Sequence, residues 1–329
     1  LKVPFGKYTN LPITKENTSE EIREFVEQSY ETLNKAVYGH REAKSEIIQT
    51  ICKWISNPTS KGTVIGLKGP MGNGKTTLVK KGISQAIKKP FAFITLGGAT
   101  DASFLEGHSY TYEGALPGRI IQILTSSNIN CMDPIIYFDE LDKVSDTAKG
   151  QEIQNLLCHL TDFSQNDEYH DKYYHGIDFD LSRAIFIFSF NDESLINPIL
   201  KDRMKVIDTK GFSTREKIEL TNDFLIPEIV KDIGFDQSNF SIENSVIQHI
   251  INHYTNEKGV RKLKGCLQTI LTKLNVISLL DTKDKKYYKI INVDKIIKKF
   301  PVDITIDLVN NLLTKSKIDD IFSKSGMYS

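Results

Sequence analysis

Five short apolar runs alternate with segments of helical periodicity in the first two thirds of the chain. The runs are almost continuously apolar or β-branched, as in strands that are covered on both faces. They lie at 63–69, 91–96, 134–140, 184–190 and 205–211. Helical patterns precede or separate them at 19–34, 40–56, 75–89 and 151–163. The alternation predicts an α/β fold with a five-stranded parallel sheet and flanking helices.

The character of the chain changes after Gly211. Ser213 or Thr214 followed by Glu216 is typical of a helix start, and the pattern stays helical to about Leu280. The sequence therefore predicts a small all-α domain after the sheet. We divide the chain into a linker and helix, an α/β domain, a helical domain and a tail, with the boundaries 1–35, 36–212, 213–300 and 301–329.

Composition and charge argue against a protein that binds nucleic acid over its whole surface and against a membrane protein. Of the 329 residues, 40% are hydrophobic and 26% are charged, which are ordinary globular values. The formal net charge is zero, which argues against a binder of nucleic acid over its whole surface. Residues 283–299 are rich in lysine, which favours a solvated helix or tail, with a local nucleic-acid patch as the alternative. No apolar run has the length of about 18 residues that a membrane helix needs.

Cysteines and histidines indicate no built metal or disulfide framework. The four cysteines form no C-x-x-C pair, so the sequence favours a reducing intracellular compartment, cytoplasm-like or within an organelle. The pairs His249/His253 and His170/His175 lack the H-E-x-x-H pattern of zinc proteases. The chain begins at Leu1 without a signal-peptide pattern, so we expect a piece of a longer protein.

The first apolar run leads directly into a glycine-rich loop, G-P-M-G-N-G-K-T, and a helical pattern follows it. This is the strand–loop–helix setting of a phosphate-binding P-loop. Backbone N–H groups would face the phosphates of ATP, Lys75 would reach the β- and γ-phosphates, and Thr76 would hold Mg²⁺. The predicted nucleotide contacts are Gly69, Pro70, Met71, Gly72, Asn73, Gly74, Lys75, Thr76 and Thr77.

The third apolar run ends in two carboxylates, Asp139 and Glu140. Charged side chains at the end of a buried strand are costly as packing, whereas carboxylates beside a nucleotide have a function. Asp139 would belong to the Mg²⁺ shell, and Glu140 would orient or deprotonate the attacking water. Together with the P-loop, the pair predicts hydrolysis of a nucleoside triphosphate.

The order of P-loop, Asp-Glu strand end and helical domain resembles an AAA+ ATPase, and in particular the ATPase module of Lon proteases. The similarity spans about residues 4–300 and is most specific in L-G-G-A-T-D-A-S-F-L-E-G-H-S-Y-T-Y-E-G-A-L-P-G-R-I-I-Q. Further segments that carry it are 38–47, 69–76, 138–144, 200–207, 211–217 and 254–263.

The resemblance implies roles for residues outside the two motifs. Asn191 matches the sensor residue that bonds the γ-phosphate or the water, and a turn asparagine is the alternative. Arg203 matches the arginine finger that serves the neighbouring subunit, and a surface salt bridge is the alternative. Arg261 matches the arginine that carries movement of the helical lid domain to the nucleotide, or else is a surface arginine at a helix start. Tyr38 and Gly39 would line the adenine pocket.

An arginine finger that reaches the nucleotide of the neighbouring subunit implies a ring of subunits. The resemblance implies that this ring is a hexamer with a central channel for polypeptide. The segment 107–119 matches the loop that places an aromatic residue in this channel, at Tyr112. A tyrosine can pack against an extended chain of any sequence. The alternative is that Tyr110 and Tyr112 are buried anchors under the loop. Glu113, where the family usually has an apolar residue, has no assigned role.

Besides Glu113, two departures from the family limit the resemblance. No peptidase serine motif is present, so we expect no cleavage of peptide bonds by this chain as given. The segment 156–174 has the family's length but altered chemistry, which leaves open its contacts, a second channel loop among them.

Three functions remain at this stage: a polypeptide translocase, a nucleotide-controlled assembly or chaperone module, and a DNA-acting motor. The presence of Glu140, Asn191 and Arg203 favours turnover over a passive switch. Zero net charge and the Lon-type segment 96–122 disfavour the DNA motor. The protein substrates stay open.

Overall fold

A computed structural model describes residues 3–99, 101–109, 111, 114–280, 285–291, 297 and 300–313. The chain divides into two compact units, which are described separately. The first contains the chain up to Pro70 and then Gly74–Lys210, and the second contains Met71–Asn73 and the chain from Gly211 onward. No helix within the described ranges is long and apolar enough to cross a membrane.

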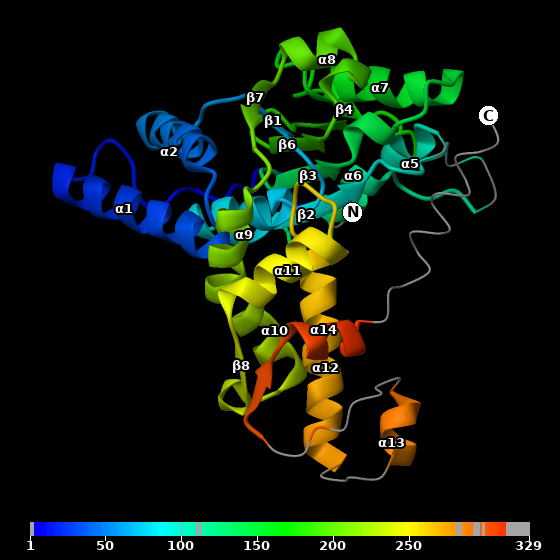
Figure 1. The fold of residues 1–329 in the computed structure, drawn as a ribbon. Coiled ribbons are helices and arrows are strands. Elements are labelled where there is room, and N and C mark those ends of the chain that lie inside the picture. The colour runs from blue at the N-terminus through cyan, green and yellow to red at the C-terminus, as the bar shows by residue number, and fades with distance from the viewer. Residues whose placement is uncertain are drawn as a thin grey trace. The chain divides into compact units, whose positions relative to one another are not determined.

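The first unit is built on a five-stranded parallel sheet in the order β2-β3-β6-β1-β7 (Figure 1). Each predicted apolar run contains one of these strands. They are β1 (Thr63–Lys68), β2 (Phe91–Thr95), β3 (Ile135–Asp139), β6 (Ile185–Phe190) and β7 (Lys205–Asp208). The predicted fold class is therefore confirmed.

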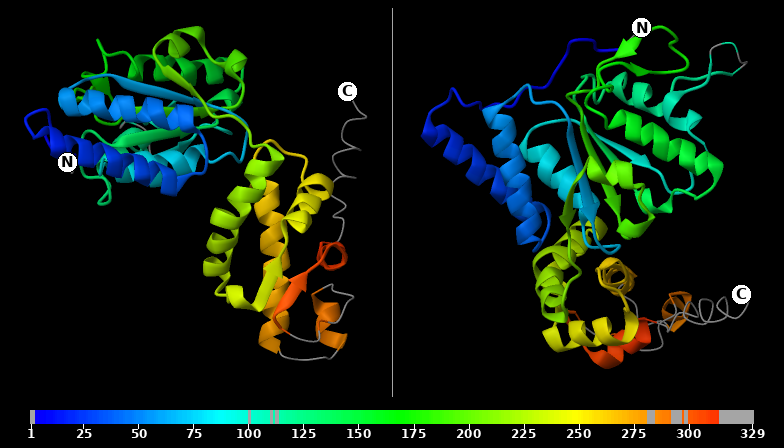
Figure 2. Two further views of the ribbon diagram at one scale, coloured as in Figure 1. Left: turned by 60° about the vertical axis from the view of Figure 1, so that its left-hand side comes forward. Right: turned by 90° about the horizontal axis from the view of Figure 1, so that it is seen from above.

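Alternate residues of the strands face two separate helical layers (Figure 2). On β3, Ile135 and Tyr137 belong to the core under one layer, whereas Ile136 and Phe138 belong to the other. The first layer comprises α1 (Ser19–Ala36), α2 (Arg41–Ser56) and the continuous helix formed by α3 (Lys75–Thr77), a π-helical segment (Leu78–Ile83) and α4 (Ser84–Ala86). The second comprises α5 (Ser103–Glu106), α6 (Arg119–Leu124), α7 (Ala148–Leu160) and α8 (Pro198–Asp202).

Beyond the main sheet, the first unit contains a short antiparallel pair that the sequence analysis did not predict. It consists of β4 (Tyr169–His170) and β5 (Asp178–Phe179), within and just after the segment 156–174. Two-residue strands lack the alternating pattern that a longer strand shows, so periodicity could not reveal them.

The second unit is mainly helical. Its helices are α9 (Thr214–Leu220), which continues through a π-helical turn into α10 (Ile226–Ile233), then α11 (Asn244–Tyr254), α12 (Arg261–Leu280), α13 (Lys285–Ile290) and α14 (Ile306–Leu312). Ser213 caps α9 in a capping box with Glu216, as its sequence pattern indicates.

The second unit also contains a parallel pair of strands, β8 (Phe240–Ile242) with β9 (Val302–Ile304). Residues 302–312, which the sequence analysis assigned to a tail, thus form β9 and α14, and Leu308, Val309 and Leu312 are buried. Pairing over a sequence distance of about 60 residues is invisible to local pattern, which explains the difference.

Candidate functional site

Three adjacent strands bring the predicted catalytic segments to one edge of the sheet. β3, β6 and β1 are neighbours, and the parallel register pairs Lys68 at the end of β1 with Phe190 at the end of β6. The glycine-rich loop therefore leaves the sheet beside Asn191, and Asp139 ends the next strand. In open parallel sheets, ligands bind at this carboxyl edge.

Lys75 points its ammonium group back over the loop that precedes it. Its Nζ donates to the carbonyl oxygens of Gly69 at 2.5 Å and Pro70 at 3.0 Å, and to Oδ1 of Asn191 at 3.3 Å. Burial lowers the pKa of Lys75, and the charges of Asp139 and Asp142 act in the opposite direction. A partly desolvated cation beside a helix start is suited to binding phosphate oxygens.

Thr76 and Asp139 are joined through the hydroxyl of Tyr137. The hydroxyl lies 3.2 Å from Thr76 Oγ1 and donates to Asp139 Oδ1 at 3.3 Å, and Ser189 Oγ also donates to this carboxylate oxygen. Burial raises the pKa of Tyr137, so the hydroxyl keeps its proton. The Thr76 hydroxyl and the Asp139 carboxylate share Tyr137 as a hydrogen-bonding neighbour, and both are hard oxygen ligands of the kind that Mg²⁺ takes together with waters and phosphates. The donor set thus fits Mg²⁺.

No larger metal site competes with this one in the described part of the chain. Within those residues, no group of three or more His, Cys, Asp or Glu side chains could hold a metal ion. The rings of His249 and His253 stack on each other at 4.1 Å, and His170 pairs with Asp178. All four cysteines are free thiols.

Glu140 has an unusual backbone conformation for a residue with a side chain. Its φ of 60° and ψ of 47° lie in the left-handed region, and its N–H donates to Ser189 Oγ at 3.3 Å. Strain of this kind is frequent where a side chain must be aimed. The Glu140 carboxylate lies over Gly97, where an added Cβ would be 2.1 Å from Oε2. Only glycine leaves room for the carboxylate in this position, and the sequence analysis did not assign Gly97 a role.

Asn191 is held in place by a buried carboxylate that the sequence analysis also missed. Asp142 Oδ2 accepts hydrogen bonds from the backbone N–H groups of Asn191 and Asp192, both at 3.2 Å. Asp142 is 6% exposed, and its Oδ1 is buried and has no hydrogen-bond partner in the described structure. The local sequence D-E-L-D offers a weak signal, because a third acidic residue so near a buried strand needs partners.

The hydrogen bonds described above for this cluster do not include the other predicted residues. Arg203, which caps α8, donates to the Cys158 carbonyl and pairs with Asp162 at 2.8 Å, so its contacts here are with the end of α7. Tyr38 and Gly39 form the turn between α1 and α2 in the first unit. Arg261 starts α12 in the second unit, and its role at the nucleotide remains a prediction.

Part of the predicted channel loop lies outside the described residues. This applies to Tyr110, Tyr112 and Glu113, so the choice between a gripping and an anchoring tyrosine stays a prediction. The two ends of the loop, by contrast, are described.

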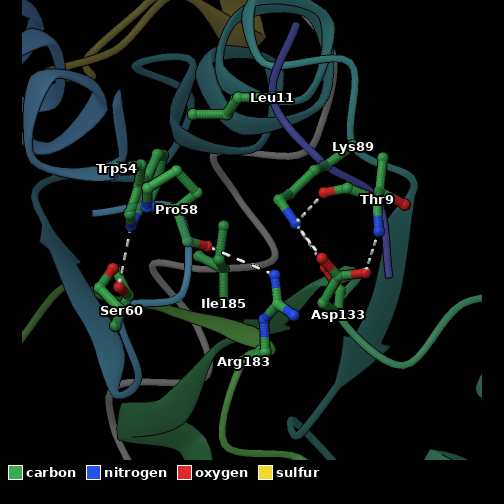
Figure 3. A pocket seen from close by; sticks show the side chains of 10 residues that line it. Thr9, Leu11, Trp54, Pro58, Ser60, Lys89, Asp133, Arg183 and Ile185 are labelled. Carbon is green, nitrogen blue, oxygen red and sulfur yellow. Dashed lines mark hydrogen bonds and ion pairs between the residues drawn. The ribbon is translucent and has the colours of Figure 1, made fainter. Parts of the chain in front are cut away.

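A small pocket lies at the opposite, amino edge of the sheet (Figure 3). Lys89 and Asp133, which precede β2 and β3, form an ion pair there, and Asp133 is fully buried. Asp133 Oδ1 accepts from the N–H of Thr9 at 2.8 Å, and Lys89 donates to the Thr9 carbonyl at 2.9 Å. The pair therefore fastens the N-terminal segment to the sheet, and its charges are used for this contact.

Comparison with known proteins agrees with the fold. Residues 65–211 match the ATPase family associated with various cellular activities (AAA). Residues 231–287 match the lid domain of the Lon protease AAA+ ATPase. The sheet, the phosphate loop and the first match define an AAA+ ATPase. More particularly, the chain belongs to the Lon protease family as its AAA+ ATPase module.

Individual relatives support the same assignment. The chain is 41% identical over 262 residues to a Lon protease homolog of Acanthamoeba polyphaga mimivirus, which covers 79% of this chain and 25% of the relative. It is 38% identical over 229 residues to a Lon protease of Desulfosudis oleivorans, with coverage of 70% and 27%. A mitochondrial Lon protease homolog of Yarrowia lipolytica is 31% identical over 305 residues, with coverage of 93% and 25%. The chain spans about a quarter of the length of these relatives.

Proposed function

We propose that this chain binds Mg-ATP at the carboxyl edge of its sheet and hydrolyses it to move and unfold polypeptide. The observation that carries the proposal is the convergence of Lys75, Asn191, Thr76 and Asp139 at one edge, with Glu140 aimed from the same strand end. Lys75 would bind phosphate oxygens, and Thr76 and Asp139 would hold the Mg²⁺, which neutralises charge on the phosphates. Glu140 would orient the attacking water and accept its proton.

The proposal extends to a ring of subunits, of which a hexamer is the expected form. Arg203 would serve the nucleotide of the neighbouring subunit, where a guanidinium can stabilise charge on the transferring phosphate. In the single chain it pairs with Asp162, so assembly would exchange this pair for a contact between subunits. Tyr112 would contact the polypeptide in the channel.

Names of the relatives support polypeptide as the substrate class, since the proteins that match over most of this chain are called Lon proteases or homologs. Proteolysis by a longer protein that contains this module is part of the proposal. The module itself would pull on the polypeptide, and a peptidase domain of the longer protein would cleave it.

The test is the ATPase rate of the chain alone, with a permanently unfolded protein, and with single-stranded DNA. Stimulation by the unfolded protein supports translocation. Stimulation only by DNA contradicts it. ATP-dependent assembly with no stimulation by either would favour the alternative, a nucleotide-controlled assembly or chaperone module. A loss of assembly on ATP removal, measured by light scattering, identifies that alternative directly.

A further inference from the structure

The two ends of the loop between α5 and α6 lie close together. The N–H of His108 donates to the carbonyl of Leu116 at 3.2 Å, which joins the outgoing and returning arms. A Cβ on Gly107 would lie 2.7 Å from the N of Gly118, and one on Gly118 would lie 2.1 Å from the carbonyl oxygen of Leu105. Glycine at both positions is therefore needed for the arms to meet in this narrow neck, formed by Leu105–His108 and Leu116–Gly118.

A buried carboxylate holds the returning arm of the neck. Asp171 is 1% exposed, and its Oδ2 accepts from the N–H of Gly118 at 2.8 Å. Its Oδ1 accepts from the N–H of Tyr173 at 2.9 Å, which fixes the carboxylate in its own turn. Burial raises the pKa of Asp171, and these N–H groups act in the opposite direction. Bonds from N–H groups to a charged acceptor are about twice as strong as neutral ones.

The outgoing arm is held by neighbours of Asp171 on the same short segment. The N–H of Lys172 donates to the Glu106 carbonyl at 2.7 Å, and the side chains of these two residues form an ion pair. The hydroxyl of Tyr169, a buried residue of β4, donates to the carbonyl of Leu105 at 3.2 Å. Residues 169–172 thus contact both arms of the neck.

We propose that Asp171 is a positioning residue that fixes the direction in which the loop between Gly107 and Gly118 leaves the fold. The inference rests on the proposed function, because the loop is the predicted carrier of Tyr112. It also assigns a role to the segment 156–174, whose chemistry the family resemblance left open. A loop that pulls on a polypeptide needs a neck that resists the load. One buried charge-assisted hydrogen bond on the returning arm, with backbone contacts and an ion pair on the outgoing arm, supplies that resistance.

The nucleotide residues need not change when the neck is loosened. None of the contacts described for Lys75, Asp139 or Asn191 involves residues 169–172. Loss of the Asp171 bond is therefore expected to act on polypeptide handling and to leave basal ATP hydrolysis intact.

The test compares Asp171→Asn with Asp178→Asn in the full chain. Asp178 lies on β5 of the same pair, and its side chain is 58% exposed, so it is a matched control. Asparagine keeps the shape of the side chain but replaces one acceptor oxygen with an NH₂ group. A bond to a charged group is worth about 1.5–3 kcal/mol, so hydrogen exchange at the Gly118 amide should accelerate at least about tenfold in Asp171→Asn alone.

The second readout is activity. We expect Asp171→Asn to keep its basal ATPase within about twofold and to lose at least about tenfold in kcat/KM for stimulation by an unfolded protein, on the same energetic scale. Tyr169→Phe removes only the hydroxyl bond to Leu105 and should shift both readouts the same way by less. If Asp171→Asn fails to fold, Tyr169→Phe provides the test in its place.

Two results would overturn the inference. Unchanged exchange at Gly118 would show that Asp171 does not hold the neck, and accelerated exchange with normal stimulation would show that the neck does not position the loop for polypeptide. Tyr112→Ala, measured in parallel, separates this inference from the proposed function. If Tyr112→Ala also keeps normal stimulation, the assignment of the loop itself is wrong.

Discussion

Glu140 combines a left-handed backbone with a carboxylate that is aimed over a glycine. Its N–H donates to Ser189 Oγ, and its carboxylate occupies space that a side chain at position 97 would reduce. In the proposed mechanism this carboxylate would accept a proton from the attacking water.

Glu140→Gln should bind ATP normally and hydrolyse it at least about 10²-fold more slowly, the usual scale for loss of a general base. Glutamine has nearly the same shape, so the fold and the Mg²⁺ ligands stay intact. Steady-state hydrolysis and equilibrium binding of a fluorescent ATP analogue provide the two measurements. Turnover near the normal rate would remove Glu140 from the proposed mechanism.

Gly97→Ala should slow hydrolysis while the Glu140 carboxylate remains present. Gly97 is not among the glycines with positive φ, so alanine fits its backbone, but the new Cβ must displace Oε2. Misplacement of a catalytic group by about 1 Å can cost about 10²-fold, so we expect kcat to fall by about tenfold or more with unchanged ATP affinity.

The control is the double variant. If Gly97 acts only through Glu140, adding Gly97→Ala to Glu140→Gln produces no further loss, because interacting sites are not additive. Equal losses in both backgrounds, or an unchanged kcat in the single variant, would show that Gly97 serves another purpose.

At the scale of elements, the turn between α1 and α2 depends on a buried lysine. Lys44 of α2 is 2% exposed, and its Nζ donates to the carbonyl of Val37 at 2.6 Å and to Oδ1 of Asn34 at 3.0 Å. It therefore joins the end of α1 to α2 just before Tyr38. Burial, helped by the nearby Arg41, lowers the pKa of Lys44 to about 8.

This pKa predicts a stability that rises with pH. Below about pH 8 Lys44 is protonated in both folded and unfolded chains, and its burial as a cation is a full penalty. Between about 8 and 10.5 the unfolded chain binds more protons, so the free energy of unfolding increases with pH. The free energy of unfolding increases by on the order of 3 kcal/mol over this range, since one pKa unit corresponds to about 1.4 kcal/mol.

Urea unfolding of the parent chain and of Lys44→Met at pH 7.5 and pH 10 measures this effect. The difference between the two chains cancels the titration of other groups. The parent should gain stability relative to Lys44→Met as the pH rises, and a difference that is the same at both pH values would contradict the assigned pKa.

At the scale of the whole molecule, the residue predicted as the arginine finger is paired within the single chain. The contacts of Arg203 are with Asp162 and the carbonyl of Cys158, at the end of α7. The described contacts of Lys75 and Asn191 do not include it. An arginine that serves catalysis from this position would do so for a neighbouring copy.

A mixing experiment tests this arrangement. Arg203→Ala should lose at least about 10²-fold in ATPase rate, below the 10³–10⁵-fold span attributed to arginine fingers. Mixed with Glu140→Gln, it should regain activity, because an intact Glu140 in one subunit then meets an intact Arg203 in the next. If Arg203 acts within its own chain, no mixture of the two variants recovers.

Prediction from sequence succeeded where the decisive signal is local. Each main strand lies in a largely apolar or β-branched run, and the phosphate loop is a contiguous string between a strand and a helix, so both could be predicted from neighbouring residues. It missed β8 with β9, and β4 with β5, because these strands are short and their pairing is visible only after folding.

The parallel α/β class, the phosphate loop and the acidic strand end could be predicted from sequence, because each of these is encoded in neighbouring residues. The distant groups that support them are identified only in the folded chain. Asp142 holds Asn191 from 49 residues away, Asp171 holds Gly118 from 53, and Gly97 makes room for Glu140. Such contacts depend on strand order and burial, where a buried polar group must find a partner wherever the fold provides one.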